Sequence, residues 1–120
     1  MKKINYIDVN ELNPLNFDSI IDVRSPAEFT EDHIPNSVNL PVLSDLERGE
    51  VGTLYKSLSP FEARKVGSAL IAENVANHIK NGLSNNNESW RPLIYCWRGG
   101  QRSKAFATIL NEVGWCVSVV

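Results

Sequence analysis

Short apolar runs alternate along the chain with longer segments whose apolar residues recur at helical spacing. Residues 19–23 and 93–96 are apolar runs of the length of a buried strand. Between them, the apolar residues of 60–82 recur at helical intervals, which predicts one long helix that ends at a glycine. A second helical segment at 106–114 precedes a last apolar, β-branched run at 116–120. This alternation predicts an α/β domain built on a parallel sheet, with helices on both faces and ligands at the carboxyl ends of the strands.

Two helix starts carry the same sequence signal. Residues 25–28 (Ser-Pro-Ala-Glu) and 59–62 (Ser-Pro-Phe-Glu) each combine a capping serine, a proline in the first turn and a glutamate at the third helical position. Each segment therefore predicts a capping box. Residues 42–58 are ambiguous, because leucines at helical spacing favour a helix while Gly49 and Gly52 interrupt it. We expect a partly helical excursion there.

The composition allows one compact domain over residues 1–120. With 120 residues, 42% of them hydrophobic, the chain can bury a core but has no room for a second domain. Its net charge of −2 gives no reason to expect strong nucleic-acid binding by this piece alone. The N-terminus lacks the apolar run of a signal peptide, and no stretch approaches a membrane span. We therefore expect a cytoplasmic protein without membrane contact.

Residues 96–103 (Cys-Trp-Arg-Gly-Gly-Gln-Arg-Ser) carry the candidate chemistry. A cysteine leaves a predicted strand, a glycine-bearing loop follows, and then a helix begins. Loop N–H groups, the positive end of the helix and two arginines would together form a cradle for an anion. A thiol in such a cradle ionises readily, and the same cradle would stabilise a persulfide, a perselenide or a bound oxyanion. We expect Cys96 to be the catalytic residue, with an anion-binding loop formed by Trp97, Arg98, Gly99, Gly100, Gln101 and Arg102.

Other polar or reactive residues have simpler explanations. The two cysteines are too few for a disulfide framework and lack zinc-like spacing, so we expect neither a metal nor a cofactor. Cys116 lies in an apolar segment and is best explained by packing, which is also the alternative for Cys96. We expect His78 on a solvated helix face and His33 to brace a turn.

Asp22 and Arg24 lie at the carboxyl end of the predicted strand 19–23. They could form an ordinary ion pair at the end of the strand, or they could brace the cysteine loop from the neighbouring strand. We favour bracing.

Two segments near the N-terminus resemble the signature of rhodanese-like domains: 22–29 (Asp-Val-Arg-Ser-Pro-Ala-Glu-Phe) and 33–41 (His-Ile-Pro-Asn-Ser-Val-Asn-Leu-Pro). The cysteine loop, together with 52–56 and 61–67, resembles the subgroup of tRNA 2-selenouridine synthases. Two departures affect only loop detail. Asp32 stands where a glycine is common, and 36–37 is Asn-Ser where Gly-Ala is common.

The resemblance implies a rhodanese-like parallel sheet of about five strands with helices on both faces, and a Cys96 that carries sulfur or selenium as a persulfide or perselenide. It further implies conversion of wobble 2-thiouridine to 2-selenouridine in tRNA, with selenophosphate or another sulfur or selenium donor. In that family a P-loop-containing domain follows and would bind the tRNA. This sequence has no Gly-x-x-x-x-Gly-Lys-Ser/Thr stretch, so we expect a chain truncated before that domain.

Three other functions remain open from the sequence. Five residues separate Cys96 from Arg102, which is the spacing of cysteine-dependent phosphatases. Such enzymes also need a carboxylic acid near the leaving oxygen, and the sequence does not place one. A stand-alone thiosulfate-type sulfurtransferase and a non-catalytic rhodanese-like regulatory module are the remaining alternatives.

Overall fold

The structure, a computed structural model, describes residues 2–97 and 100–120. Its centre is one sheet of parallel strands in the order β1-β5-β4-β2-β3, as the alternating pattern predicted. The strands are short, and the two longest lie side by side in the middle of the sheet. Their bounds are β1 Asn5–Tyr6, β2 Ser19–Asp22, β3 Val38–Asn39, β4 Pro92–Tyr95 and β5 Ser118–Val119.

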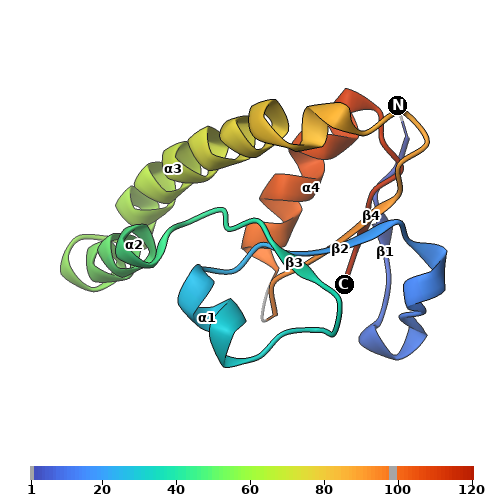
Figure 1. The fold of residues 1–120 in the computed structure, drawn as a ribbon. Coiled ribbons are helices and arrows are strands. Elements are labelled where there is room, and N and C mark those ends of the chain that lie inside the picture. The colour runs from blue at the N-terminus through green and yellow to red at the C-terminus, as the bar shows by residue number, and fades with distance from the viewer. Residues whose placement is uncertain (1, 98–99) are drawn as a thin grey trace.

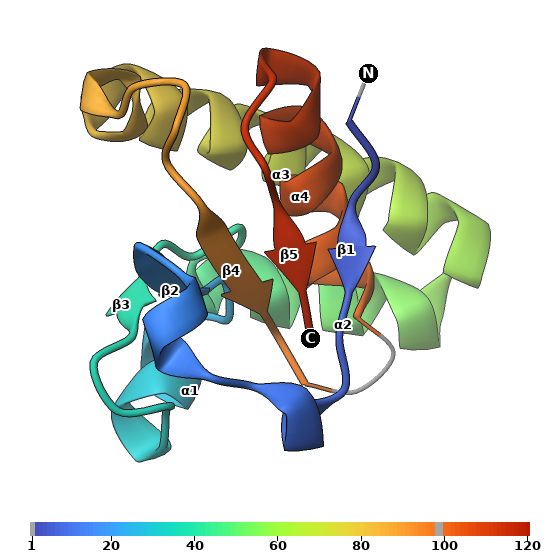
Figure 2. The same ribbon diagram turned by 90° about the vertical axis from the view of Figure 1, so that its right-hand side faces the viewer.

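Helical segments lie against both faces of the sheet, but unequally (Figures 1 and 2). The three long helices cover one face, and short 3-10 turns with their flanking loops cover the other. Among the residues described, no helix combines the length and apolar character needed to cross a membrane. The helices are α1 Pro26–Glu31, α2 Asp45–Ser57, α3 Pro60–Asn81 and α4 Gln101–Val113; the 3-10 turns are η1 Val9–Glu11, η2 Pro14–Asn16 and η3 Leu83–Asn85.

The alternating side chains of the central strands form two cores. On the side of the long helices, Ile21 and Ile94 pack with Phe106 and Leu110 of α4. Phe106 and Leu110 are fully buried, and truncation of such a phenylalanine to alanine costs about 3–5 kcal/mol of stability. On the opposite side, Ile20, Leu93 and Tyr95 pack under the residues that follow η1 and η2. The β2–β4 pair is thus fixed from both faces.

The register of β2 against β4 brings two functional segments together. Asp22 is paired with Tyr95, and the N–H of Val23 donates to the carbonyl of Tyr95 at 3.1 Å. The residues that leave these two strands therefore emerge next to each other, at the carboxyl edge of the sheet. This is the edge at which parallel α/β sheets bind their ligands.

Helix α2 corrects the expectation that two glycines would interrupt the segment 42–58. The helix runs without a break from Asp45 to Ser57. The helix begins with a capping box that was not predicted. The Ser44 hydroxyl accepts from the Glu47 N–H at 3.1 Å, and the Glu47 carboxylate accepts from the Ser44 N–H at 2.8 Å. Packing of α2 against α3 supplies the rest of its stability, since tertiary contacts override weak helix propensity.

The two predicted capping signals form to different degrees. In α1 the Glu28 carboxylate accepts from the N–H and the hydroxyl of Ser25, at 3.2 and 3.0 Å, as predicted. In α3 only half of the box forms, because Ser59 accepts from the Glu62 N–H while the Glu62 carboxylate pairs with Lys65 instead. Helix α3 still begins at the predicted proline and ends before a glycine.

His78 does not lie on a solvated helix face, which corrects that expectation. Its Nε2 lies 2.7 Å from the carbonyl oxygen of Pro41, and its ring centroid is 6.0 Å from that of Phe106. The reason is that α3 packs along the sheet close to the chain that leaves β3. The histidine therefore ties α3 to that segment.

Candidate active site

Cys96 is the first residue after the central strand β4, and its side chain is 1% exposed. Its sulfur has two partners on one residue of α4. The sulfur accepts from the N–H of Ser103 at 3.3 Å, and the thiol donates to the Ser103 hydroxyl at 3.2 Å. That hydroxyl in turn donates to the carbonyl of Gly100 at 3.0 Å. The thiol is thus held in place by the start of the following helix.

The sulfur occupies the position of a helix cap. The N-cap residue Gly100 adopts a left-handed conformation with φ 67°, and it has no side chain to cap the free N–H groups. Ser103 is the third helical residue, whose N–H a capping oxygen normally binds. Here the sulfur of Cys96, the residue after β4, binds that N–H in place of a capping oxygen. The helix N-terminus, which carries partial positive charge, is therefore directed at the sulfur.

Arg102 is bound to a carboxylate rather than free. Its two terminal nitrogens lie 2.7 and 3.3 Å from the two oxygens of Glu28, and Arg48 approaches the same carboxylate at 3.3 Å. Burial would raise the pKa of Glu28, but the hydrogen bond and charge of Arg102, with the contacts to Ser25, outweigh it and lower the pKa to about 2. Glu28 is therefore ionised at neutral pH. An anion at the loop would have to share Arg102 with it.

Asp22 and Arg24 form a buried ion pair that also touches the loop. Arg24 donates to both oxygens of Asp22, and it donates as well to the carboxylate and the carbonyl of Asp32. Burial would lower the pKa of Arg24, yet the bonds to Asp22 raise it above its ordinary value, so the guanidinium stays charged. Its carbon lies 5.9 and 5.8 Å from the ring centroids of Tyr95 and Trp97. The pair thus lies against the residues on either side of Cys96.

The departures from the family signature have structural explanations. Asn36 has φ 67°, a conformation that favours glycine and that asparagine tolerates, which accounts for the glycine common there. The Ser37 hydroxyl lies 3.2 Å from that of Tyr95, which also accepts from the Ile34 N–H at 3.0 Å. Burial raises the pKa of Tyr95, so the phenol remains neutral. Asp32 replaces a glycine and gains the contact with Arg24.

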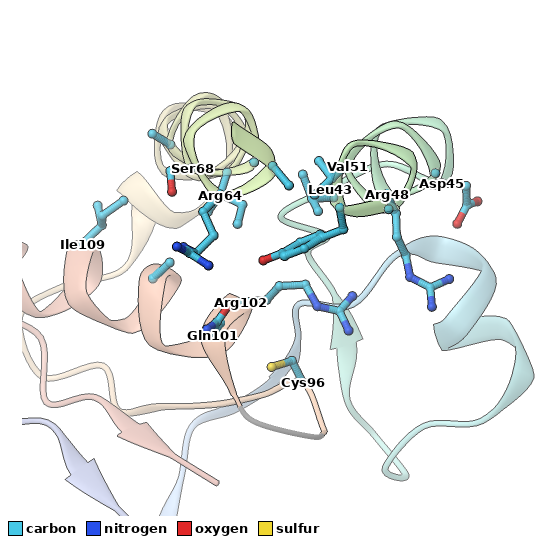
Figure 3. Close-up of a pocket in the computed structure, with 18 residues that line it drawn as sticks. Leu43, Asp45, Arg48, Val51, Arg64, Ser68, Cys96, Gln101, Arg102 and Ile109 are labelled. Carbon is cyan, nitrogen blue, oxygen red and sulfur yellow. The ribbon is translucent and has the colours of Figure 1, made fainter. Parts of the chain in front are cut away.

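A cavity of about 910 Å³ opens above the sulfur (Figure 3). Helices α2, α3 and α4 form its walls, and Cys96 lies at its base. Of the predicted loop, Gln101 and Arg102 line this cavity with Cys96. Sequence patterns could not reveal the wall opposite the loop, because the α2–α3 contacts that build it are tertiary. Its side chains include Arg48, Tyr55, Arg64 and Ser68.

The other loop residues that the structure describes, Trp97 and Gly100, do not line this cavity. Trp97 and Gly100 line a second, shallower hollow of about 410 Å³, which they share with Lys104. Trp97 adopts φ 43°, unusual for a bulky residue, and its ring lies 5.0 Å from that of Tyr95. Predicted loop residues Arg98 and Gly99 lie outside the described part of the chain. Within that part, no three His, Cys, Asp or Glu side chains come together as metal ligands.

His33 and Cys116 lie apart from the sulfur cavity. The ring of His33 stacks on Phe29 at 3.8 Å, and its Nδ1 lies 2.7 Å from the Phe29 carbonyl oxygen, so it braces the end of α1 as expected. Cys116 precedes β5 instead of starting it and is half-buried, with the Asn5 amide nitrogen 3.8 Å from its sulfur. Neither residue lines the cavity above Cys96.

A parallel five-stranded sheet with a cysteine that caps the following helix is the arrangement of a rhodanese-like domain. Residues 8–120 match the rhodanese-like domain family, and the chain belongs to that family. Within it, the sequence is similar to tRNA 2-selenouridine synthases. It is 37% identical over 101 residues to that of Psychromonas ingrahamii, covering 84% of this chain and 28% of the relative. It is 40% identical over 96 residues to that of Nitrosomonas europaea, covering 79% of this chain and 25% of the relative.

A solved structure shares the fold over almost the whole chain. It is the N-terminal domain of a putative ATP/GTP binding protein from Clostridium difficile 630, with a TM-score of 0.75 and 30% sequence identity. The match covers 98% of this chain and 90% of that one. By contrast, the chain spans only 25–28% of the synthases it resembles. It corresponds to a rhodanese-like domain of those proteins, not to their full length.

Proposed function

We propose that this chain is a sulfur- or selenium-carrying domain related to tRNA 2-selenouridine synthases, with Cys96 as the carrier. One observation carries the proposal: the Cys96 sulfur takes the capping position at the start of α4, between the N–H and the hydroxyl of Ser103. A negatively charged sulfur is stabilised there without a separate base. The terminal sulfur of a persulfide would extend from this point into the cavity.

Thiosulfate provides a donor with a simple electron balance. The Cys96 thiolate attacks the outer sulfur, a new S–S bond forms, and sulfite leaves with the electron pair of the broken bond. The product is a Cys96 persulfide. Loop N–H groups and the start of α4 stabilise the anionic sulfite during its departure. A thiol or cyanide can then remove the outer sulfur and regenerate the Cys96 thiolate.

The electron balance also constrains the selenium donor. Selenophosphate holds selenium at a lower oxidation level than the outer sulfur of thiosulfate. Its conversion to phosphate and a perselenide would leave two electrons without an acceptor. We therefore propose that Cys96 carries selenium from donors of the thiosulfate type, such as selenosulfate, with sulfite as the leaving group. Selenophosphate is proposed as an anion that binds the same loop.

A turnover assay tests the proposal against its rivals. The wild-type chain should form thiocyanate from thiosulfate and cyanide, Cys96→Ser should be inactive, and Cys116→Ser should retain most of the rate. Loss of turnover in Cys116→Ser with full activity in Cys96→Ser would reject the proposal. A chain that forms no persulfide and no thiocyanate would support the non-catalytic module.

A phosphatase is the second candidate, because the Cys96-to-Arg102 spacing is typical of that class. The state of Glu28 argues against it. A pKa of about 2 keeps this carboxylate ionised, so it cannot protonate a leaving oxygen at neutral pH. Asp45 also lines the cavity, but its carboxylate accepts from the Ala27 N–H at 3.0 Å. Robust hydrolysis of an aryl phosphate that depends on Cys96 would favour the phosphatase.

We further propose that the domain acts within a longer protein in which a P-loop domain binds tRNA. The support is indirect. The similar synthases are about four times as long as the matched segment, and the related solved domain comes from a putative ATP/GTP binding protein. The wobble 2-thiouridine would then be the physiological acceptor, in the cytoplasm. The gene sequence beyond the codon for Val120 tests this directly.

A further inference from the structure

Arg64 of α3 differs from the other arginines that the structure describes. It lines the cavity above Cys96, its side chain is exposed, and in Figure 3 its guanidinium points into the cavity from the wall opposite the loop. Within residues 2–97 and 100–120 it has no carboxylate partner. Each of the others does: Arg24, Arg48, Arg91 and Arg102 pair with Asp22 and Asp32, Glu28, Asp18 and Glu28, respectively.

The glycines of α2 give an independent indication. A glycine inside a helix costs about 0.5–1 kcal/mol relative to alanine, so two of them call for an explanation. Packing does not supply one, since a Cβ at Gly49 or Gly52 would meet no described atom within 4 Å. Both glycines line the cavity. They leave the wall open beside Tyr55, a residue that is 42% exposed.

The cavity is too large for the donor alone. Cavities of about 300–1,000 Å³ hold ligands of many atoms, and this one measures about 910 Å³. A tetrahedral anion at the cysteine loop would fill only a small part of it. The rest is bounded by apolar side chains that include Val51, Ile71 and Ile109, and by Arg64, which unlike Arg48 and Arg102 has no carboxylate partner among the described residues. Such a lining suits a planar ring attached to an anionic group.

We propose that Arg64 binds a phosphate group of the acceptor nucleotide, whose ring lies along the open wall at Gly49, Gly52 and Tyr55. The guanidinium of an arginine can bind two phosphate oxygens at once, and an exposed aromatic ring offers a surface on which a base can stack. The proposal rests on the proposed function, because the ring must lie within reach of Cys96. It assigns part of acceptor recognition to this domain, in addition to any further domain.

The test is NMR or calorimetric titration of the 120-residue chain with uridine 5′-monophosphate, with uridine, and with inorganic phosphate. Wild type should bind the nucleotide more tightly than either of its parts. Arg64→Gln should weaken nucleotide binding by about tenfold and leave uridine binding unchanged. Gly52→Leu should weaken binding of nucleotide and nucleoside but not of inorganic phosphate. Lys65→Gln is the matched control, because Lys65 is adjacent but pairs with Glu62 at 2.9 Å.

Two outcomes would overturn this assignment: a nucleotide that binds Arg64→Gln as tightly as wild type, or a nucleotide that binds wild type no more tightly than inorganic phosphate. Persulfide formation on Cys96, measured in the same samples, separates this proposal from the proposed function. Arg64-dependent nucleotide binding without a persulfide would retain the binding site and reject the sulfur carrier. A persulfide on Cys96 in a chain with no Arg64-dependent nucleotide binding would retain the sulfur carrier and reject the binding site.

Discussion

At the scale of single residues, the sulfur of Cys96 replaces a capping oxygen. Helices normally satisfy their first N–H groups with a side chain from the N-cap residue. Gly100 has none, so the acceptor is the sulfur of Cys96, the residue after β4, which precedes Ser103 by seven residues but is adjacent to it in space. Under the proposed function, the reactivity of Cys96 and the stability of the start of α4 depend on the same contact between Cys96 and Ser103.

Replacement of Ser103 by alanine tests this contact. The variant keeps the N–H but loses the hydroxyl 3.2 Å from the sulfur, so a thiolate loses a donor that can turn to it from the Gly100 carbonyl. We expect iodoacetamide to label Cys96 about threefold to tenfold more slowly near pH 6, which corresponds to the net contribution of about 1 kcal/mol of a typical hydrogen bond. Cys116 in the same protein is the internal control. A Cys96 rate unchanged by the substitution would show that the hydroxyl does not support the thiolate.

Loop residues also show the limits of sequence patterns. The glycine, arginine and cysteine content of residues 96–102 was enough to single out Cys96 as the candidate thiol. It was not enough to show that Arg102 is bound by Glu28, because Glu28 looked only like a capping residue of α1. The spacing of residues within one segment predicts only local geometry. The contact between Glu28 and Arg102 joins two helices that are far apart in the sequence, so it depends on the tertiary fold.

At the scale of elements, Glu28 joins three helices. It closes the capping box of α1, binds Arg102 of α4 and approaches Arg48 of α2. The carboxylate is partly buried, and its charged form is favoured in the folded state. A single residue at the start of a short helix thus positions the two longer helices that flank the cysteine cavity.

The stability supplied by Glu28 should depend on pH. Its pKa is about 2 in the folded protein against 4.5 for the free group, so the folded state favours the ionised form. The contribution is full above pH 4.5 and is lost as the pH falls toward 2. Urea unfolding of wild type and Glu28→Gln should differ most near neutral pH and converge over that acidic range. A difference that stays constant from pH 6 to about pH 3 would contradict this role.

The helices and strands that were predicted well are those whose bounds follow from signals within their own segment of sequence. The strands 19–23 and 93–96 and the long helix of α3 follow from apolar periodicity, with a proline at the start and a glycine after the end. Helix α2 was underestimated because its two glycines suggested a break. The Ser44 and Glu47 cap and the packing against α3 outweigh that penalty.

At the scale of the whole molecule, the sheet order creates the site. The central position of β4 places Cys96 beside the segment that leaves β2, and α2 and α3 close over it to form the cavity (Figures 1 and 3). The fold class was predictable from alternating elements and from the resemblance. The cavity wall was not, since Tyr55 and Arg64 belong to helices whose approach depends on tertiary packing rather than on any motif.

The role of Cys96 as the sulfur carrier is tested most simply by locating the sulfur that thiosulfate delivers. The chain is treated with thiosulfate, freed of excess reagent, digested with trypsin without reductant and analysed by mass spectrometry. Cleavage after Arg98 and Lys104 places Cys96 and Cys116 in different peptides. If Cys96 is the sulfur carrier, the Cys96 peptide should carry one added sulfur atom that cyanide removes, and the Cys116 peptide should carry none. Added sulfur on Cys116 alone, or on neither peptide, would contradict that role.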